Sequence, residues 1–184
     1  MISNPTVVAD SRATIRELVM IGAGTLGRQL AERAALAGFA TVLQDLLPSS
    51  RERAMAAIRA DLERAGINPE DVLGRIRLAG SLDDALAAAD LVIETTPDEL
   101  ESKQEMFTLL DRMAPRNAIL VAVTMLPLAM FCDVTCREAS CIAVRVDLDD
   151  MQAIVTAHPA NPATLVASVL DVFRMLGFTA KLEA

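Results

Sequence analysis

A glycine-rich turn between a short apolar run and a segment with helical spacing constrains this chain more than any other feature. The turn reads Gly-Ala-Gly-Thr-Leu-Gly, a G-x-G-x-x-G pattern that directly follows the apolar run 18–21. Gly22 permits a tight turn, Gly24 has no side chain that would keep a phosphate from the backbone, and Gly27 lets helix and strand approach closely. A helix that begins here offers free amide groups to an anion. The pattern predicts a dinucleotide diphosphate site formed by Gly22, Gly24, Thr25, Leu26 and Gly27.

A carboxylate completes the dinucleotide pattern. Asp45 follows the second apolar run, 40–43, and lies 23 residues after Gly22. The spacing of about 20 residues is typical of an acid that accepts hydrogen bonds from the adenosine ribose. Such an acid would repel a 2′-phosphate, and the two residues that follow it are leucines rather than arginines. We therefore expect NAD rather than NADP; the alternative is an ordinary loop-capping aspartate.

Apolar runs and helical segments alternate along most of the chain. Strands are expected at 18–21, 40–43, 75–79, 91–93 and 119–123, and then at 142–146, 153–156 and 178–182. Helices are expected at 26–37, 48–65, 83–89, 97–113 and 126–131, and from an Asn161-Pro162 cap to 176. This order predicts an α/β fold of the Rossmann type, a doubly wound, mostly parallel sheet with helices on both faces.

Composition excludes several functional classes. The formal net charge is −8 without a basic block, and aromatic residues make up 3% of the chain, so neither polyanions nor single-stranded nucleic acid are expected partners. No apolar run is long enough to span a membrane, and the first 16 residues lack a secretory pattern, so a cytoplasmic protein is expected. We expect an N-terminal extension over 1–16 and one dinucleotide-binding domain over 17–184.

The cysteines and the single histidine do not form a metal-binding pattern. Cys132, Cys136 and Cys141 cluster without a second ligand group, and His158 lies further along the chain. We expect no metal site and reduced thiols that pack as small hydrophobic side chains.

Two blocks of residues carry a resemblance to a known family. Residues 19–27 and 42–45 surround the turn and the acid, and residues 88–94, Ala-Ala-Asp-Leu-Val-Ile-Glu, precede Pro97 and Lys103. With these blocks the chain, from about residue 17 to its end, resembles the N-terminal NAD-binding domain of the 3-hydroxyacyl-CoA dehydrogenases. The resemblance implies NAD as the cofactor, a link to fatty acid metabolism, and Thr95, Asp98 and Lys103 as residues along the cofactor. For Lys103 the alternative is a solvated lysine on an amphipathic helix.

The catalytic pattern of the family fits poorly, so the catalytic residues are unknown. The family has a Ser-Asn-Thr-Ser-Ser segment after the fifth strand, of which only Thr124 remains here. Arg145 stands at the ungapped position of the family's histidine, and Val155 at that of the glutamate that orients it. Arginine cannot act as a base at neutral pH, but it can bind a carboxylate or phosphate. A His-x-x-Asn-Pro segment does begin at His158, but it lies about a dozen residues too late.

Three functions follow from these observations. The first is an NAD(H)-binding relative that is weak or inactive alone as an oxidoreductase, because the family's helical second domain is absent from this sequence. The second is an active dehydrogenase of a 3-hydroxyacyl-CoA or a small hydroxy acid, completed by a partner chain or a homo-oligomer. The third is a scaffold that has lost the cofactor. Apolar side chains exposed on the last helix and strand would favour an oligomer.

Overall fold

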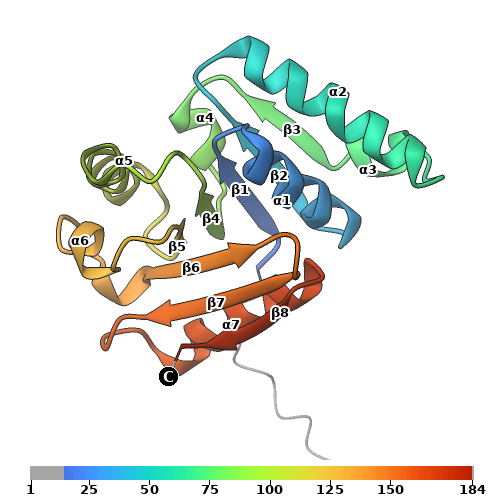
Figure 1. Ribbon diagram of the computed structural model, residues 1–184. Helices are drawn as coiled ribbons and strands as arrows, with labels where there is room; N and C mark the ends of the chain where they lie inside the picture. The colour runs from blue at the N-terminus through green and yellow to red at the C-terminus, as the bar shows by residue number, and fades with distance from the viewer. Residues whose placement is uncertain (1–14, 184) are drawn as a thin grey trace, which may run out of the picture.

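The fold is one eight-stranded sheet with helices on both faces, as a computed structural model of residues 15–183 shows (Figure 1). The strand order is β3-β2-β1-β4-β5-β6-β7-β8. Strands β1 to β6 run parallel, β7 runs antiparallel to β6, and β8 is parallel to β7. The strands are β1 Glu17–Ile21, β2 Ala40–Gln44, β3 Ile76–Ala79, β4 Leu91–Glu94, β5 Ile119–Val123, β6 Cys141–Asp147, β7 Gln152–Ala157 and β8 Thr179–Leu182. The predicted fold class is confirmed.

The helices form the crossover connections that parallel neighbouring strands require. The longest is α2, which begins at Pro48, a residue suited to the first turn because its missing N–H has no helical partner there. The helices are α1 Thr25–Leu36, α2 Pro48–Arg64, α3 Pro69–Leu73, α4 Leu82–Leu86, α5 Leu100–Met113, α6 Ala129–Cys132 and α7 Ala163–Met175, with a 3-10 turn η1 at Glu138–Ser140.

Two hydrophobic clusters lie on the two faces of the sheet. Successive strand residues point to opposite faces, so Leu18 and Met20 of β1 join one cluster, while Val19 and Ile21 join the other. The first cluster also holds buried residues of α1, α2, α3 and α7, and the second holds those of α4, α5 and α6. Burial on both faces explains why β1 reads as an uninterrupted apolar run.

The strand order reverses between β1 and β4. The chain runs outward from β1 to β2 and β3, returns to β4 on the other side of β1, and continues outward to β5 and β6. In sheets of this type, ligands bind beyond the carboxyl ends of the strands at such a reversal. The loops after Ile21 and Glu94 meet there, since Thr95 N donates to Ile21 O at 2.9 Å.

Several local expectations are corrected by long-range contacts. Asn161 does not cap α7: Pro162 is the N-cap, and the Asn161 amide donates instead to Glu138 O and Cys141 O, at 3.0 and 3.1 Å. The five-residue helix α3 was not expected from the sequence. Within residues 15–183 no helix is both long and apolar enough to cross a membrane. Most of the expected 1–16 extension lies outside the described residues.

Candidate functional site

The glycine turn adopts the geometry that its sequence predicts. Gly22 has φ +101°, a conformation that L side chains rarely adopt, and its amide donates to Gln44 O at 2.9 Å. A Cβ on Gly27 would overlap Gly22 O and would come within 2.6 Å of Thr95 Oγ1. The first and last glycines of the motif are therefore required by the fold itself.

Gly24 differs from the other two glycines of the motif. It is the N-cap of α1, its φ of −69° is open to any residue, and a Cβ built on it meets no atom within 4 Å. No side chain caps α1, and no acidic residue lies in its first turn. The first amides of a helix have no partner inside the helix, so this end is open to an anion.

Asp45 faces the glycine turn from the end of β2. Its Oδ2 accepts a hydrogen bond from Ala23 N and its Oδ1 accepts one from Leu47 N, both at 2.9 Å. A carboxylate has about four lone-pair sites, so these two bonds leave capacity for further donors. The turn and the acid therefore lie side by side, which is the arrangement that a diphosphate and its neighbouring ribose need. The residues present fit this part of a dinucleotide.

An arginine that the sequence pattern places on a solvated helix face lies beside this acid. Arg51, in the first turn of α2, donates from its guanidinium to the main-chain oxygen of Asp45. A Cβ on Gly80, after β3, would lie 3.8 Å from the Arg51 guanidinium. No arginine directly follows Asp45 in the sequence, but the first turn of α2 brings Arg51 into contact with it. The spacing of Asp45 and Arg51 across a predicted helix start was the signal available in the sequence.

Lys103 lies beneath the site rather than on its surface. Its side chain and that of Glu94 are both fully buried, and Lys103 Nζ lies 2.7 Å from Glu94 Oε2. The ammonium also donates to Thr96 O and Val123 O, each at 3.4 Å. The alternative of a solvated lysine is therefore wrong. A buried ammonium needs such partners because burial of an unpaired charge is costly.

Asp98 connects this buried pair to the surface. It lies 3.5 Å from Lys103 Nζ, accepts from Met125 N at 2.7 Å, and accepts from the Thr124 hydroxyl. Burial alone would raise the pKa of Asp98, but the hydrogen bonds from Thr124 and Met125 and the charge of Lys103 outweigh it, so the pKa lies below its usual range. Asp98 is an anion at neutral pH, and the Thr124 hydroxyl is committed to it as a donor.

A hollow of about 240 Å³ lies between the loops that follow β4 and β5. It brings together three predicted cofactor residues, Leu26, Thr95 and Asp98, with Thr124 and Arg145. The Thr95 hydroxyl donates to Ile21 O at 2.9 Å and to Gly22 O at 3.2 Å, so it also supports the glycine turn. A second hollow of about 260 Å³, lined by residues of β6 and β7, shares Met125, Arg145 and Val146 with the first.

Arg145 is held by an acid from the end of the described chain. Its Nη2 lies 2.6 Å from Glu183 Oε1, and the Thr156 hydroxyl donates to the other oxygen of Glu183. The hydrogen bonds from Thr156 and Arg145 lower the pKa of Glu183. Sequence reasoning missed Glu183, because it is 38 residues from Arg145 and has no pattern around it.

His158 and the cysteines lie apart from this site. His158 is absent from the residues that line the two hollows, and its Nδ1 accepts from Ala160 N at 3.2 Å. Cys132 and Cys141 are buried, as expected, but Cys136 is exposed. No group of three or more metal-ligating side chains occurs among the described residues.

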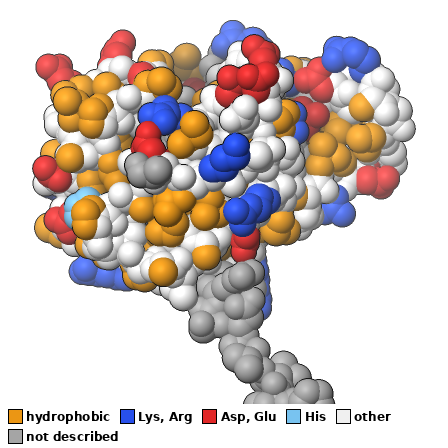
Figure 2. All heavy atoms as spheres, turned by 60° about the horizontal axis from the view of Figure 1, so that its bottom comes forward, with side chains coloured by type: hydrophobic (Ala, Val, Ile, Leu, Met, Phe, Trp, Pro, Cys, Tyr) orange, Lys and Arg blue, Asp and Glu red, His pale blue; other side chains and the backbone are white. Residues whose placement is uncertain are grey.

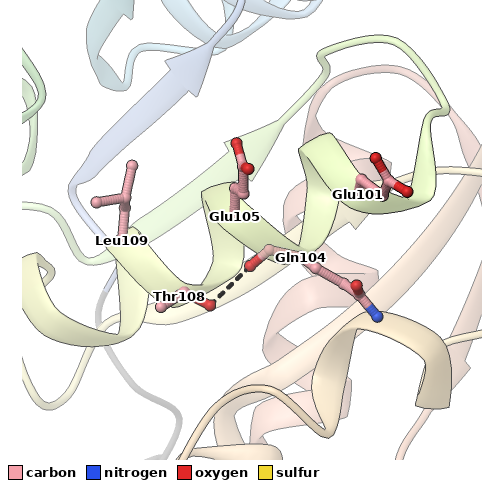
Figure 3. Close-up of a pocket in the computed structure, with 5 residues that line it drawn as sticks. All are labelled: Glu101, Gln104, Glu105, Thr108 and Leu109. Carbon is pink, nitrogen blue, oxygen red and sulfur yellow. Dashed lines mark hydrogen bonds between the residues drawn. The ribbon is translucent and has the colours of Figure 1, made fainter.

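Another hollow lies away from this site, beside α5. It measures about 560 Å³ and is lined by Glu101, Gln104, Glu105, Thr108 and Leu109. Figure 3 shows Glu101, Glu105 and Leu109 along one side of the helix, while Gln104 turns toward α6 and donates to Met130 O at 2.7 Å. None of the predicted site residues lines it. It lies beside a single helix, whereas the proposed site lies at the ends of several strands.

Comparison with known proteins identifies relatives along almost the whole chain. The sequence model of the family described as "3-hydroxyacyl-CoA dehydrogenase, NAD binding domain" matches residues 17–174. A "Probable 3-hydroxybutyryl-CoA dehydrogenase" of Bacillus subtilis is 29% identical over 88% of this chain and 54% of its own length. A "3-hydroxybutyryl-CoA dehydrogenase" of Bradyrhizobium diazoefficiens is 38% identical over 61% of this chain and 40% of its own. The chain thus spans about half the length of these relatives or less.

Solved structures share the fold at lower identity. The crystal structure of 3-hydroxybutyryl-CoA dehydrogenase from Escherichia coli is 24% identical, with a TM-score of 0.86 over 92% of this chain and 38% of that one. A diketoreductase is 23% identical, with a TM-score of 0.85 over 93% of this chain and 65% of that one.

Proposed function

This chain belongs to the family of 3-hydroxyacyl-CoA dehydrogenase NAD-binding domains, and from this premise we propose which of its residues hold NAD. The observation that carries the proposal is the open space over Gly24 next to the Asp45 carboxylate. The first-turn amides of α1 bind the diphosphate, together with the backbone of Gly22, Thr25, Leu26 and Gly27.

Each of the two ribose groups of NAD is assigned to one carboxylate. Asp45 accepts hydrogen bonds from the adenosine ribose hydroxyls and repels a 2′-phosphate. The neighbouring positive charge of Arg51 weakens this preference for NAD over NADP. Asp98 accepts from the nicotinamide ribose, and Lys103 acts through Asp98, since its ammonium is buried. Thr95 holds the turn in place. Thr124 and Arg145 line the adjoining hollow, and NAD held by these residues would supply hydride-transfer chemistry.

The chain alone is weak or inactive as an oxidoreductase. Hydroxyl oxidation needs a base, which contributes about 10²–10⁴-fold to the rate. The residue at the position of the family's base is Arg145, whose guanidinium does not lose its proton at neutral pH. The Thr124 hydroxyl, the remnant of the family's polar segment, already donates to Asp98. What remains is cofactor binding with a ligand pocket beside it.

A second candidate is an active dehydrogenase completed by a partner subunit or a second copy, with a 3-hydroxyacyl-CoA or a small hydroxy acid as substrate. Its support is an apolar face. Figure 2 looks onto the side of β8 and α7, where hydrophobic side chains gather near the middle of the view, and Met175 and Leu182 are more than half exposed.

A cytoplasmic location of the protein also stays a prediction.

The third candidate, a scaffold without cofactor, has an observation against it. Loss of the cofactor would leave the groove over Gly24 free to fill with a side chain. A Cβ at Gly24 meets no atom within 4 Å. No side chain occupies the position of a Gly24 Cβ, so this alternative has no support at the place where it would be expected.

Calorimetric titration with NAD and with NADP tests the proposed site. We expect saturable binding of NAD, weaker binding of NADP, and about tenfold or more loss of NAD affinity in Asp45→Ala, because hydrogen bonds to a charged group are worth about 1.5–3 kcal/mol. The same variant should reduce the difference in affinity between NAD and NADP. Asp71→Ala, which removes an exposed acid from α3, is the matched control. Absence of heat at millimolar NAD would remove the basis of the proposal.

A separate experiment tests the proposal that the chain alone is weak or inactive as an oxidoreductase. NADH formation from 3-hydroxybutyryl-CoA is measured with the chain alone and with added candidate partners. We expect no turnover above background from the chain alone. Turnover of the isolated chain at the rate of an ordinary dehydrogenase would overturn the assignment of weak activity and would leave the cofactor site untouched.

A further inference from the structure

Arg145 is an ordered cation at the centre of two adjoining hollows. Both hollows, of about 240 and 260 Å³, are lined by Met125, Arg145 and Val146. Among the described residues that line them, Arg145 is the one with a positive charge. Its side chain is 38% exposed, so a ligand can reach it.

Glu183 and Thr156 hold this cation in place. Glu183 N donates to Val155 O at 2.8 Å, so the end of the chain adds one more residue to the β7–β8 pairing. From there one carboxylate oxygen accepts from Arg145 at 2.6 Å and the other from the Thr156 hydroxyl. A guanidinium has five N–H donors, and the Glu183 bond uses one of them. The remaining fork can bind a planar anion in a bidentate manner.

The other charges around the hollows are already engaged. Asp98, in the first hollow, accepts from Thr124 and Met125 and lies beside Lys103. Asp147, in the second, accepts from Asp149 N at 2.9 Å and Asp150 N at 3.0 Å. Asp98 and Asp147 thus line the hollows together with Arg145, while Glu183 is the acid that contacts its guanidinium.

The walls between these charges are largely apolar. Leu26 and Val123 line the first hollow, Ile154 lines the second, and Met125 and Val146 line both. A bare inorganic anion would leave these side chains without contact. An organic acid with a short carbon body would cover them and would still present its carboxylate to the guanidinium.

We propose that Arg145 binds the carboxylate of a small oxo- or hydroxy-acid in this hollow, in competition with Glu183. The inference rests on the proposed function for one point only, that the hollow adjoins the nicotinamide. It assigns a ligand class that differs from a CoA thioester, whose reacting end has no negative charge. Glu183 is a positioning residue, which orients the guanidinium and sets the affinity that an incoming carboxylate must exceed.

Titration of acetoacetate, with and without saturating NADH, tests this inference by calorimetry or protein NMR. We expect binding of acetoacetate and about tenfold or more weaker binding of pentane-2,4-dione, a neutral ketone of similar shape, because the charge-assisted pair is lost. Arg145→Gln should lose acetoacetate binding to a similar degree. Glu183→Gln should strengthen it, because the competing charge is removed while an amide keeps the contacts. The two variants move in opposite directions, which a general loss of structure would not produce.

Controls separate the possible failures. Arg53→Gln, at an exposed arginine of α2, should leave acetoacetate binding unchanged, and Arg145→Lys should fall between wild type and Arg145→Gln because it keeps charge without the fork. Equal affinity for the neutral ketone, equal affinity for inorganic phosphate, or weaker binding in Glu183→Gln would each overturn the inference. Failure of NADH to bind while acetoacetate binds through Arg145 would instead overturn the cofactor proposal.

Discussion

At the scale of single residues, the glycines of the turn have different roles. Gly22 and Gly27 are required by backbone conformation and by the close approach of α1 to the turn. Gly24 has an ordinary φ and open space before it, so the fold does not require a glycine there. The absence of a side chain at Gly24 therefore matters for a ligand rather than for folding.

Gly24→Val should abolish NAD binding and leave the fold intact. The added side chain would fill the space over the helix end, while the stability cost is about 1 kcal/mol or less, since valine is a poorer N-cap than glycine. The melting temperature should fall by no more than about 2–4 °C. Calorimetry and thermal melts measure the two effects, with the exposed Ala65→Val as control. Unchanged NAD affinity in Gly24→Val would count against the diphosphate assignment.

At the scale of elements, a buried ion pair attaches α5 to β4. Lys103 reaches from the first turn of α5 to Glu94 at the end of β4, and both side chains are excluded from water. Glu94 also accepts from Thr96 N at 2.6 Å, so the loop between the two elements is held by the same carboxylate. The pair sets where α5 begins and thereby where Asp98 lies.

Lys103→Met should destabilise the protein by about 3–5 kcal/mol, because it leaves Glu94 as an uncompensated buried charge. The double variant Lys103→Met/Glu94→Leu should recover much of this loss, since it removes both charges. Urea denaturation measures the free energy of unfolding, and Lys181→Met, at an exposed lysine of β8, is the matched control. A double variant no more stable than Lys103→Met would contradict the ion-pair account.

At the scale of the whole molecule, the proposed site joins elements from both halves of the sheet. The turn after β1, the acid after β2 and the loop after β4 meet where the strand order reverses. The strands that carry them, β1, β2 and β4, each contribute residues to both hydrophobic clusters. A ligand that bridges them therefore stabilises the folded state of the domain as a unit.

Bound NAD should raise the melting temperature of the whole domain. At a concentration of 100 times Kd the linkage is worth about 2.7 kcal/mol, which corresponds to a shift of about 5–10 °C for a chain of this size. Differential scanning calorimetry with NAD, NADP and no ligand gives the comparison. We expect the shift to be larger for NAD than for NADP and to vanish in Gly24→Val. A shift of equal size in that variant would indicate a different binding site.

Local sequence patterns were enough to predict the features of this protein that depend on neighbours along the chain. The apolar runs, the glycine turn and the acid at the end of β2 are local patterns, because strand, turn and helix signals lie within a few residues of one another. These patterns were sufficient for the fold class, the family and the cofactor NAD.

The other features depend on contacts between segments that are far apart in the sequence and compete for the same side chains. Asn161 left the expected cap of α7 to bond Glu138 and Cys141, and Lys103 is buried rather than solvated because Glu94 lies opposite it. Arg51, in the first turn of α2, contacts Asp45, and Glu183 contacts Arg145 across the intervening strand β7. A charged or polar side chain takes the partner that burial requires, and that partner is known only once the chain has folded.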